Sequence, residues 1–309
     1  MLFGYIFGTS SYPGGTATKQ IYVNSSFETY YIPASLKNVV ITGGAIRYNV
    51  FQNCTGLTGV EIRSGVTGIW GNAFAGCSGL TSMTLPFVGD SRTAATGRQA
   101  LFGYIFGENS YTGGTETKQV YGTGVNDSPT FYIPTTLKSV VITDTTQLGY
   151  GAFSSCRGLT SIGLPGGLTS IGDKAFQNCK GLTDIEIPGG LTSIGADAFR
   201  GCSELMGIEI PDSVKSIGEG AFSSCSKLTT ITFGANSQLT SIGASAFWGS
   251  DELTRIVIPI GVTSIGANAF RDCGKLTIYA RVTEANKPNG WVNNWNFSAC
   301  QVEWGYTGE

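Results

Sequence analysis

The chain has 309 residues, of which 41% are apolar and only 13% charged, with 45 glycines and a net charge of −2. The charged share is about half the usual 25%, and the apolar share is too high for a disordered chain. The net charge of −2 argues against a nucleic-acid surface, which needs clustered lysines and arginines. Histidine is absent, which excludes Ser-His-Asp and Cys-His nucleophile pairs and histidine metal ligands.

The N-terminal part of the chain is duplicated, because the heptapeptide LFGYIFG at residues 2–8 returns at residues 101–107. Each copy is followed by a long insertion, which in the second copy contains Lys118–Tyr121, a Gly/Asn/Asp/Ser/Pro stretch and Phe131–Ile133. Two extended runs around a turn-forming stretch predict a β-hairpin. The heptapeptide is repeat sequence rather than a signal peptide, since it lacks a basic region and its twin is internal. The chain starts inside a module, so we expect it to be a piece of a longer protein.

Aromatic residues gather in both insertions, and loops on a rigid scaffold often carry recognition. Tyrosine offers a large amphipathic contact area at low entropic cost. We therefore predict that the two hairpins bind a ligand together, through Tyr22, Tyr30, Tyr31, Tyr121, Phe131 and Tyr132. The alternative is that these rings turn inward and cover the edge of the core.

A 23-residue repeat dominates the rest of the chain, with the pattern L-T-x-I-x-I-P-x-x-L/V-T-S-I-G-x-x-A-F-x-x-C. Its phenylalanines are regularly spaced, except for a 25-residue step from Phe222 to Phe247. In the copy that starts at Leu182, period-2 alternation predicts a strand that ends at Pro188. A second extended piece ends at Gly195, where glycine tolerates a positive φ. The Ala-Phe-x-x-Cys spacing predicts a short helical turn.

A single repeat has nothing against which to bury its apolar side chains, so the repeats must stack at about 4.8 Å. The sequence predicts one β-rich α/β solenoid over residues 1–309. It contains a first module with its insertion (1–100), a second module with the regular repeats (101–278) and a C-terminal cap (279–309). The L-x-x-I-x-I segment and the I-G-x-x-A-F-x-x-C line resemble the BspA-like leucine-rich-repeat surface proteins of bacteria, although no asparagine ladder follows the strand. The resemblance implies a right-handed superhelix.

Seven cysteines follow the repeat, and Ser250 replaces one in the same position. Their spacing allows disulfides between neighbouring repeats, whereas a straight row does not suit tetrahedral zinc. We interpret them as small, buried, reduced side chains. Carboxylates at outward strand positions, such as Glu186 and Glu209, are expected to be solvated; weak cation binding or glycoside hydrolysis is the alternative. The repeated cysteines are Cys54, Cys77, Cys156, Cys179, Cys202, Cys225 and Cys273.

Residues 287–306 concentrate Trp291, Trp295, Phe297 and Trp304. Solenoids need an atypical end unit to shield the last core face, so these rings predict a cap. Aromatic rings also stack on sugars, which leaves a carbohydrate site as the alternative.

These observations favour a non-enzymatic, extracellular or cell-surface module that binds a protein or glycan, as the BspA-like resemblance also implies. The alternatives are a structural spacer that projects other domains and a carbohydrate-binding protein. We expect no cofactor, no metal, no nucleic-acid partner and a monomer. A membrane span is not expected, since no apolar run approaches about 20 residues.

Overall fold

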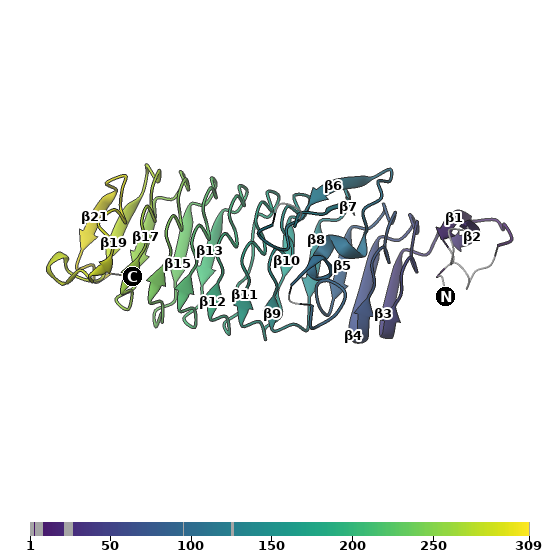
Figure 1. Cartoon of the computed structure of the whole chain (residues 1–309), viewed down its shortest axis with the longest axis horizontal. Helices are drawn as coiled ribbons and strands as arrows, with labels where there is room; N and C mark the ends of the chain where they lie inside the picture. The colour runs from purple at the N-terminus through teal and green to yellow at the C-terminus, as the bar shows by residue number, and fades with distance from the viewer. Residues whose placement is uncertain (1–2, 4–8, 22–26, 95, 125–126, 309) are drawn as a thin grey trace. The chain divides into compact units, whose positions relative to one another are not determined.

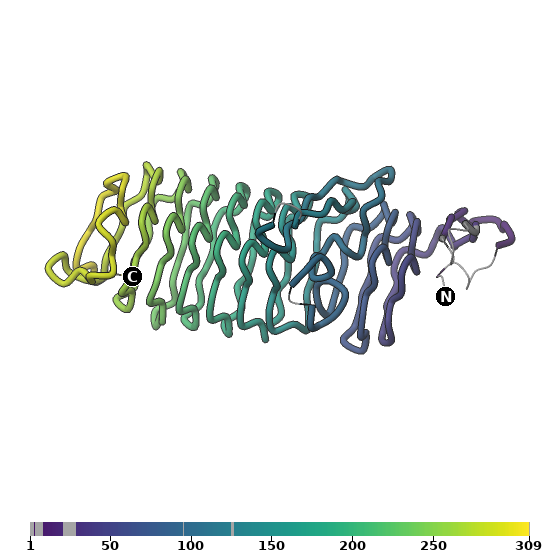
Figure 2. The backbone as a smooth tube through the Cα atoms, in the orientation of Figure 1, coloured from purple at the N-terminus to yellow at the C-terminus, as the bar shows by residue number. Residues whose placement is uncertain are grey.

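A computed structural model describes residues 3, 9–21, 27–94, 96–124 and 127–308 of the chain (Figure 1). The chain divides into two compact units, Met1–Thr145 and Thr146–Glu309. In each unit the backbone winds through stacked turns, here called rungs, and Figure 2 shows those of the second unit in green and yellow. The predicted solenoid architecture is therefore present in both units.

The first unit contains a parallel sheet and two antiparallel hairpins. The strands of the sheet lie in the order β8-β5-β4-β3, formed by Ser139–Ile142, Ser82–Leu85, Gly59–Ile69 and Asn38–Ile46. The hairpins are β1 (Gly15–Ile21) with β2 (Phe27–Pro33), and β6 (Gly114–Lys118) with β7 (Thr130–Pro134). Two short 3-10 helices, η3 (Arg98–Ala100) and η4 (Phe102–Ile105), precede the second hairpin.

The second unit has two parallel sheets along the solenoid. One consists of four-residue strands in the order β13-β15-β17-β19-β21: Gly207–Ile210, Thr230–Phe233, Arg255–Ile258, Thr277–Ala280 and Gln301–Trp304. The other consists of two-residue strands in the order β9-β11-β12-β14-β16-β18-β20: Gln147–Leu148, Ser170–Ile171, Ser193–Ile194, Ser216–Ile217, Ser241–Ile242, Ser264–Ile265 and Gly290–Trp291. The unit also contains β10 (Ser161–Gly163) and the 3-10 helix η5 (Glu284–Asn286). The strand predicted from Leu182 to Pro188 is not formed, since Asp184 makes only an isolated parallel bridge to Ser161.

A column of phenylalanine rings forms the centre of the second unit's core. Phe199 is fully buried and stacks between Phe176 and Phe222, with ring centroids 5.1 and 5.3 Å away. Phe247 and Phe270 continue the column at 5.4 Å with nearly parallel rings. The 23-residue spacing of phenylalanine therefore predicted the register of the rungs correctly.

The predicted α/β class and its short helical turns are wrong, since among the described residues the helices η3, η4 and η5 are all short and of the 3-10 type. Each Ala-Phe-x-x-Cys segment instead forms two tight turns. In the rung of Phe199, Asp197 and Gly201 both have positive φ, of 53° and 72°. The amides of Asp197, Phe199 and Gly201 donate to carbonyls of the following rung. Because these amides bond along the solenoid axis, they cannot make the i to i−4 bonds of an α-helix.

Gly195 also has a different role from the predicted one. The backbone φ of Gly195 is not positive. A Cβ at this position would, however, lie 2.5 Å from the backbone nitrogen of Asp173 in the preceding rung. Gly218 and Gly243 are equally close to the backbone behind them. Glycine is therefore needed here because neighbouring rungs approach closely.

Threonine hydroxyls also join the rungs. The Oγ1 hydroxyl of Thr192 donates to the carbonyl of Thr169 at 2.9 Å, and Thr263 donates to Thr240 in the same way at 3.3 Å. Each bond joins equivalent positions 23 residues apart. This explains why the repeat favours threonine at these positions.

Aromatic rings near the C-terminus pack on the end of the phenylalanine column. Trp295 lies edge-on against Phe270, with ring centroids 5.9 Å apart, and it also contacts Trp291 at 5.0 Å. The indole nitrogen of Trp291 donates to the carbonyl of Val262 at 3.0 Å. Trp304 stacks on Trp291 at 5.9 Å. Trp291 and Trp295 are buried, so these two rings shield the apolar core.

Candidate binding groove

The outward face of the β13–β21 sheet presents two rows of side chains. Each strand alternates between inward apolar residues, most of them buried, and outward residues, as the register of the sheet shows. One row contains Gly207, Thr230, Arg255, Thr277 and Gln301, and the other contains Glu209, Thr232, Val257, Tyr279 and Glu303. A ligand on this face would meet carboxylates near both edges of the sheet and uncharged or cationic residues in its centre.

The sheet opens between β15 and β17. These strands pair only at Thr230 and Arg255, whereas β17 and β19 pair over four positions. The rung that starts at Leu228 is the one with two extra residues, and Gly234 stands where other repeats have the strand-ending proline. The pairing of β15 with β17 thus ends after its first pair, in the rung that contains the two extra residues.

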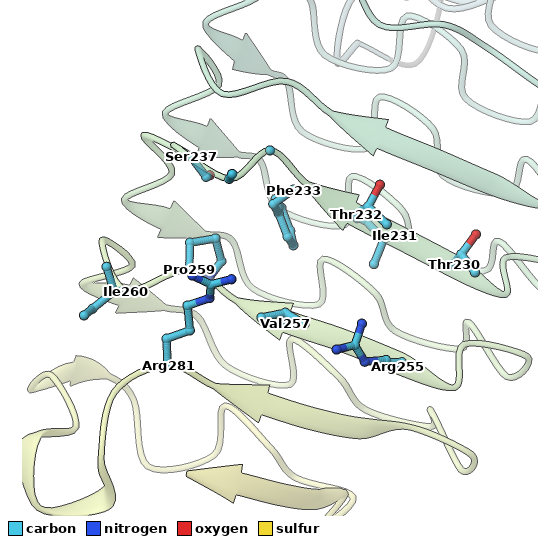
Figure 3. Close-up of a pocket in the computed structure, with 12 residues that line it drawn as sticks. Thr230, Ile231, Thr232, Phe233, Ser237, Arg255, Val257, Pro259, Ile260 and Arg281 are labelled. Carbon is cyan, nitrogen blue, oxygen red and sulfur yellow. The ribbon is translucent and has the colours of Figure 1, made fainter. Parts of the chain in front are cut away.

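A shallow groove of about 190 Å³ fills this opening (Figure 3). Its apolar lining includes Phe233, Val257, Pro259 and Ile260, and Ile260 is 72% exposed. Phe233 is half-buried, although the equivalent Ile210 and Ile258 are fully buried. Polar lining comes from the threonines of β15 and from Ser237. The groove thus combines apolar surface with hydrogen-bonding groups, as small binding sites usually do.

Two arginines and no carboxylate are among the residues that line the groove. Arg255 lies over the rings of Tyr279 and Tyr306, 4.9 and 5.4 Å from their centroids. It also donates to the Tyr306 hydroxyl at 2.6 Å. Arg281 follows β19 and donates to the carbonyl of Gly308 at 3.4 Å. Both guanidinium groups are thus positioned by contacts near the C-terminus and give the groove a positive charge.

Asp212 holds the widened corner in place. Its Oδ1 accepts a hydrogen bond from the amide of Asn236 at 3.0 Å, and its carbonyl accepts one from the amide of Gln238 at 2.8 Å. A Cβ on Gly234 would lie 2.1 Å from the same Oδ1. The corner that borders the groove therefore depends on glycine at position 234.

The predicted binding residues of the hairpins are not part of this groove. Tyr30 and Phe131 are 2% and 1% exposed, so their rings belong to the core and offer no binding surface. Tyr31, Tyr121 and Tyr132 are half-buried. Tyr22 lies outside the described residues. That the exposed parts of these tyrosines contact a ligand stays a prediction.

Hydrogen bonds of two glutamines hold the hairpins against the rest of the first unit. The Nε2 amide of Gln20 donates to the carbonyls of Val50 and Gln52, each at 3.1 Å. In the second hairpin, Oε1 of Gln119 accepts the amide of Gly103 at 2.6 Å. Both glutamines are fully buried, so one face of each hairpin covers the edge of the core.

The repeated cysteines are buried and carry free thiols. Burial raises the pKa of Cys179, Cys225 and Cys273 to about 12. A buried thiol with a raised pKa is a poor nucleophile, because the thiolate is the reactive form. Within the described ranges, no group of three or more His, Cys, Asp or Glu side chains could hold a metal ion. Glu186 and Glu209 are exposed.

The sequence reasoning missed Phe233, Arg255 and Arg281. The signal that could have found the first of them is the 25-residue step between Phe222 and Phe247, because an extra-long rung disturbs strand pairing where it occurs. The two arginines carry no comparable signal, since nothing in the repeat distinguishes them from other outward residues.

The repeats match the family model of the BspA type leucine rich repeat region in six copies, over residues 17–89 and 128–278. The chain therefore belongs to the BspA-type leucine-rich-repeat family. This fold and family are typically non-enzymatic. In the part of the chain that the structure describes, no helix has the length and apolar character needed to cross a bilayer.

Several solved leucine-rich-repeat structures are similar to this chain. A leucine rich cell surface protein from Faecalibacterium prausnitzii is 22% identical, with a TM-score of 0.34 and coverage of 98% of this chain and 96% of the other. A leucine-rich-repeat protein from T. pallidum is 20% identical, with a TM-score of 0.38 and coverage of 80% and 91%. One from Eubacterium ventriosum is 17% identical, with a TM-score of 0.38 and coverage of 82% and 94%. A search of characterised protein sequences gives no significant match.

Proposed function

We propose that this chain is a non-enzymatic, protein-binding module of a secreted or surface-attached bacterial protein, and that it binds its ligand at the groove between β15 and β17. The groove is the observation that carries the proposal, because it places the exposed Ile260 and the half-buried Phe233 and Val257 beside two arginines. Solenoids commonly use such extended faces to hold their partners.

A structural spacer has no need for this surface. Ile260 is 72% exposed and Val257 lies beside it in the same groove. Contiguous exposed apolar surface is a feature of interaction sites, whereas isolated apolar residues are common on any protein. The groove therefore favours a binding module over a spacer.

The carbohydrate-binding alternative has less support than protein binding. It relied on the tryptophans near the C-terminus and on carboxylates of the strand face, but Trp291 and Trp295 are buried and Trp304 packs on Trp291. Rings that contact one another in this way do not offer free faces for a sugar. A protein ligand is consequently the better-supported partner.

The experiment measures binding of the chain to purified extracellular-matrix proteins and mucins by biolayer interferometry. We expect the wild type to bind at least one protein, and Ile260→Asp to weaken that binding about tenfold or more, since it places a charge on the apolar contact. Met206→Asp is the matched control, because Met206 is 56% exposed and does not line the groove.

Two results would contradict the proposal. One is wild-type binding to a glycan array with no binding to any of the proteins. The other is an Ile260→Asp variant that is folded and binds its protein partner as tightly as the wild type.

A further inference from the structure

The positions of the two arginines define the length of the groove. Arg255 begins β17, whereas Arg281 follows Ala280, which pairs with Ile258 at the end of β17. The two residues therefore differ by four positions along the strand direction, which corresponds to about 13 Å at about 3.3 Å per residue. In Figure 3, Val257 lies between them, and Phe233 and Pro259 border the same space. The groove is thus cationic at both ends and apolar in between.

An extended peptide has a matching period. Its alternate side chains point to the same face, so residues i, i+2 and i+4 span about 13 Å on one side. Resting on the proposed protein-binding function, we propose that the groove binds an extended acidic peptide segment of the pattern acidic–x–apolar–x–acidic, laid along β15 and β17. The two carboxylates meet Arg255 and Arg281, and the apolar side chain lies against Phe233 and Val257.

The arginines suit carboxylates in particular. Arginine presents a planar fork of N–H donors that matches a carboxylate, and such charge-assisted bonds are stronger than neutral ones. Arg255 is held by its two tyrosine contacts, so it loses little conformational entropy when it binds. Two arginines within a chain of net charge −2 are too few for a nucleic-acid backbone.

The surrounding carboxylates fix the direction of the peptide. Glu209 lies beside Thr232 on the neighbouring strand β13, and Glu303 lies beside Tyr279 on β21. An acidic peptide laid across the strands would approach these carboxylates and be repelled. A peptide laid along the strands keeps its acidic residues near the arginines. The pattern of charges on the sheet therefore favours the lengthwise orientation.

The test uses the full chain and fluorescein-labelled peptides, with binding measured by fluorescence anisotropy. The probe contains Glu-Thr-Leu-Thr-Glu between serine flanks. A shuffled peptide with Glu-Glu-Leu-Thr-Thr has the same charge and composition, and a third peptide carries Gln in place of both Glu. We expect the probe to bind at least about tenfold more tightly than either comparison peptide, and added salt to weaken it.

Protein variants locate the contact. Arg281→Gln should weaken probe binding about tenfold, which is typical for the loss of a charge-assisted contact. Arg255→Gln should have a similar effect, although it also removes the bond to Tyr306, so Arg281 is the cleaner test. Arg157→Gln is the control, because Arg157 is exposed, carries the same charge and does not line the groove.

The inference is overturned if the probe does not bind at about millimolar concentration, if the shuffled peptide binds equally, or if Arg281→Gln leaves binding unchanged. Equal binding of the shuffled peptide would show unspecific charge attraction. If a matrix protein binds in an Ile260-dependent manner while the probe does not, the peptide pattern is wrong and the proposed function stands. If neither protein nor probe binds, both fail.

Discussion

The thiol of Cys202 donates a hydrogen bond to the carbonyl oxygen of Phe176 in the preceding rung, with Sγ and oxygen 3.2 Å apart. Cys179 and Cys225 make the same contact with the phenylalanine one rung back. Ser250 replaces the thiol by a hydroxyl and donates to Phe222 at 2.9 Å. The position therefore requires a small hydrogen-bond donor, which explains why both cysteine and serine occur there.

This contact predicts different effects for two substitutions. Cys202→Ala removes the donor and leaves a small cavity, so we expect the free energy of unfolding to fall by about 1–2 kcal/mol. Cys202→Ser keeps a donor and should cost less than alanine. Urea denaturation followed by circular dichroism measures both. Equal losses for the two variants would show that the hydrogen bond contributes nothing.

The raised thiol pKa values predict a loss of stability at high pH. Burial raises the pKa of Cys225 from 9.0 to about 12. The unfolded thiol ionises first, so its contribution is complete below about pH 9 and is lost as the pH rises toward 12. The free energy of unfolding should fall by about 1.4 kcal/mol per pH unit for each such thiol. Cys225→Ser should show a shallower fall between about pH 9 and 11 than the wild type; identical slopes would contradict the assignment.

The phenylalanine column predicts a large effect at Phe199, whose ring is fully buried between two others. Phe199→Ala should lower the free energy of unfolding by about 3–5 kcal/mol, since it removes the ring and leaves a cavity. Phe199→Leu keeps most of the volume and should cost clearly less. Thermal unfolding of the two variants tests this, and a melting temperature unchanged in Phe199→Ala would disprove the stacked core.

The corner beside the groove predicts an effect of Gly234→Ala. The new Cβ would lie 2.1 Å from Oδ1 of Asp212, so the Asp212 carboxylate must move away from its bond with the Asn236 amide or the corner must shift. We expect a lower melting temperature and weaker ligand binding, with partial recovery of both when Asp212→Ala is added. Gly189→Ala is the control, because a Cβ there meets nothing within 4 Å. Equal behaviour of the two alanine variants would show that the corner does not depend on glycine.

The periodicity of the sequence was sufficient to predict the stacked core and the hairpins. Phenylalanine every 23 residues defines the register directly, and paired extended runs around a turn-rich stretch define each hairpin. The second hairpin pairs at 114–118 rather than at 118–121, although the amides of Gln119 and Tyr121 continue the bonding toward Pro129 and Asp127.

The turns were mispredicted because spacing alone is ambiguous. Apolar side chains three or four residues apart fit a helical turn, but they equally fit two tight turns with positive φ. In successive rungs the first positive-φ position holds Gly151, Lys174, Asp197, Gly220, Ser245 and Asn268, so glycine marks only two of these six positions in the sequence. Only the hydrogen bonds between rungs decide between the two conformations.

The groove depends on pairing between rungs, which local patterns do not describe. The two extra residues after Leu228 are visible in the sequence, but their effect on β15 and β17 follows from the neighbouring rungs. The tyrosines of the hairpins were more conspicuous, yet Tyr30 and Phe131 are buried. The aromatic composition of the hairpins thus suggested a binding site there, whereas the exposure and charge of the groove residues favour a site on the β13–β21 sheet.

Hydrogen–deuterium exchange of the chain, free and bound to its protein ligand, tests the binding site most directly. We expect slower exchange on binding at residues 230–237 and 255–260, which line the groove, and unchanged exchange in the hairpin at 114–134. Protection of the hairpin with no change at the groove would contradict the proposed binding site between β15 and β17.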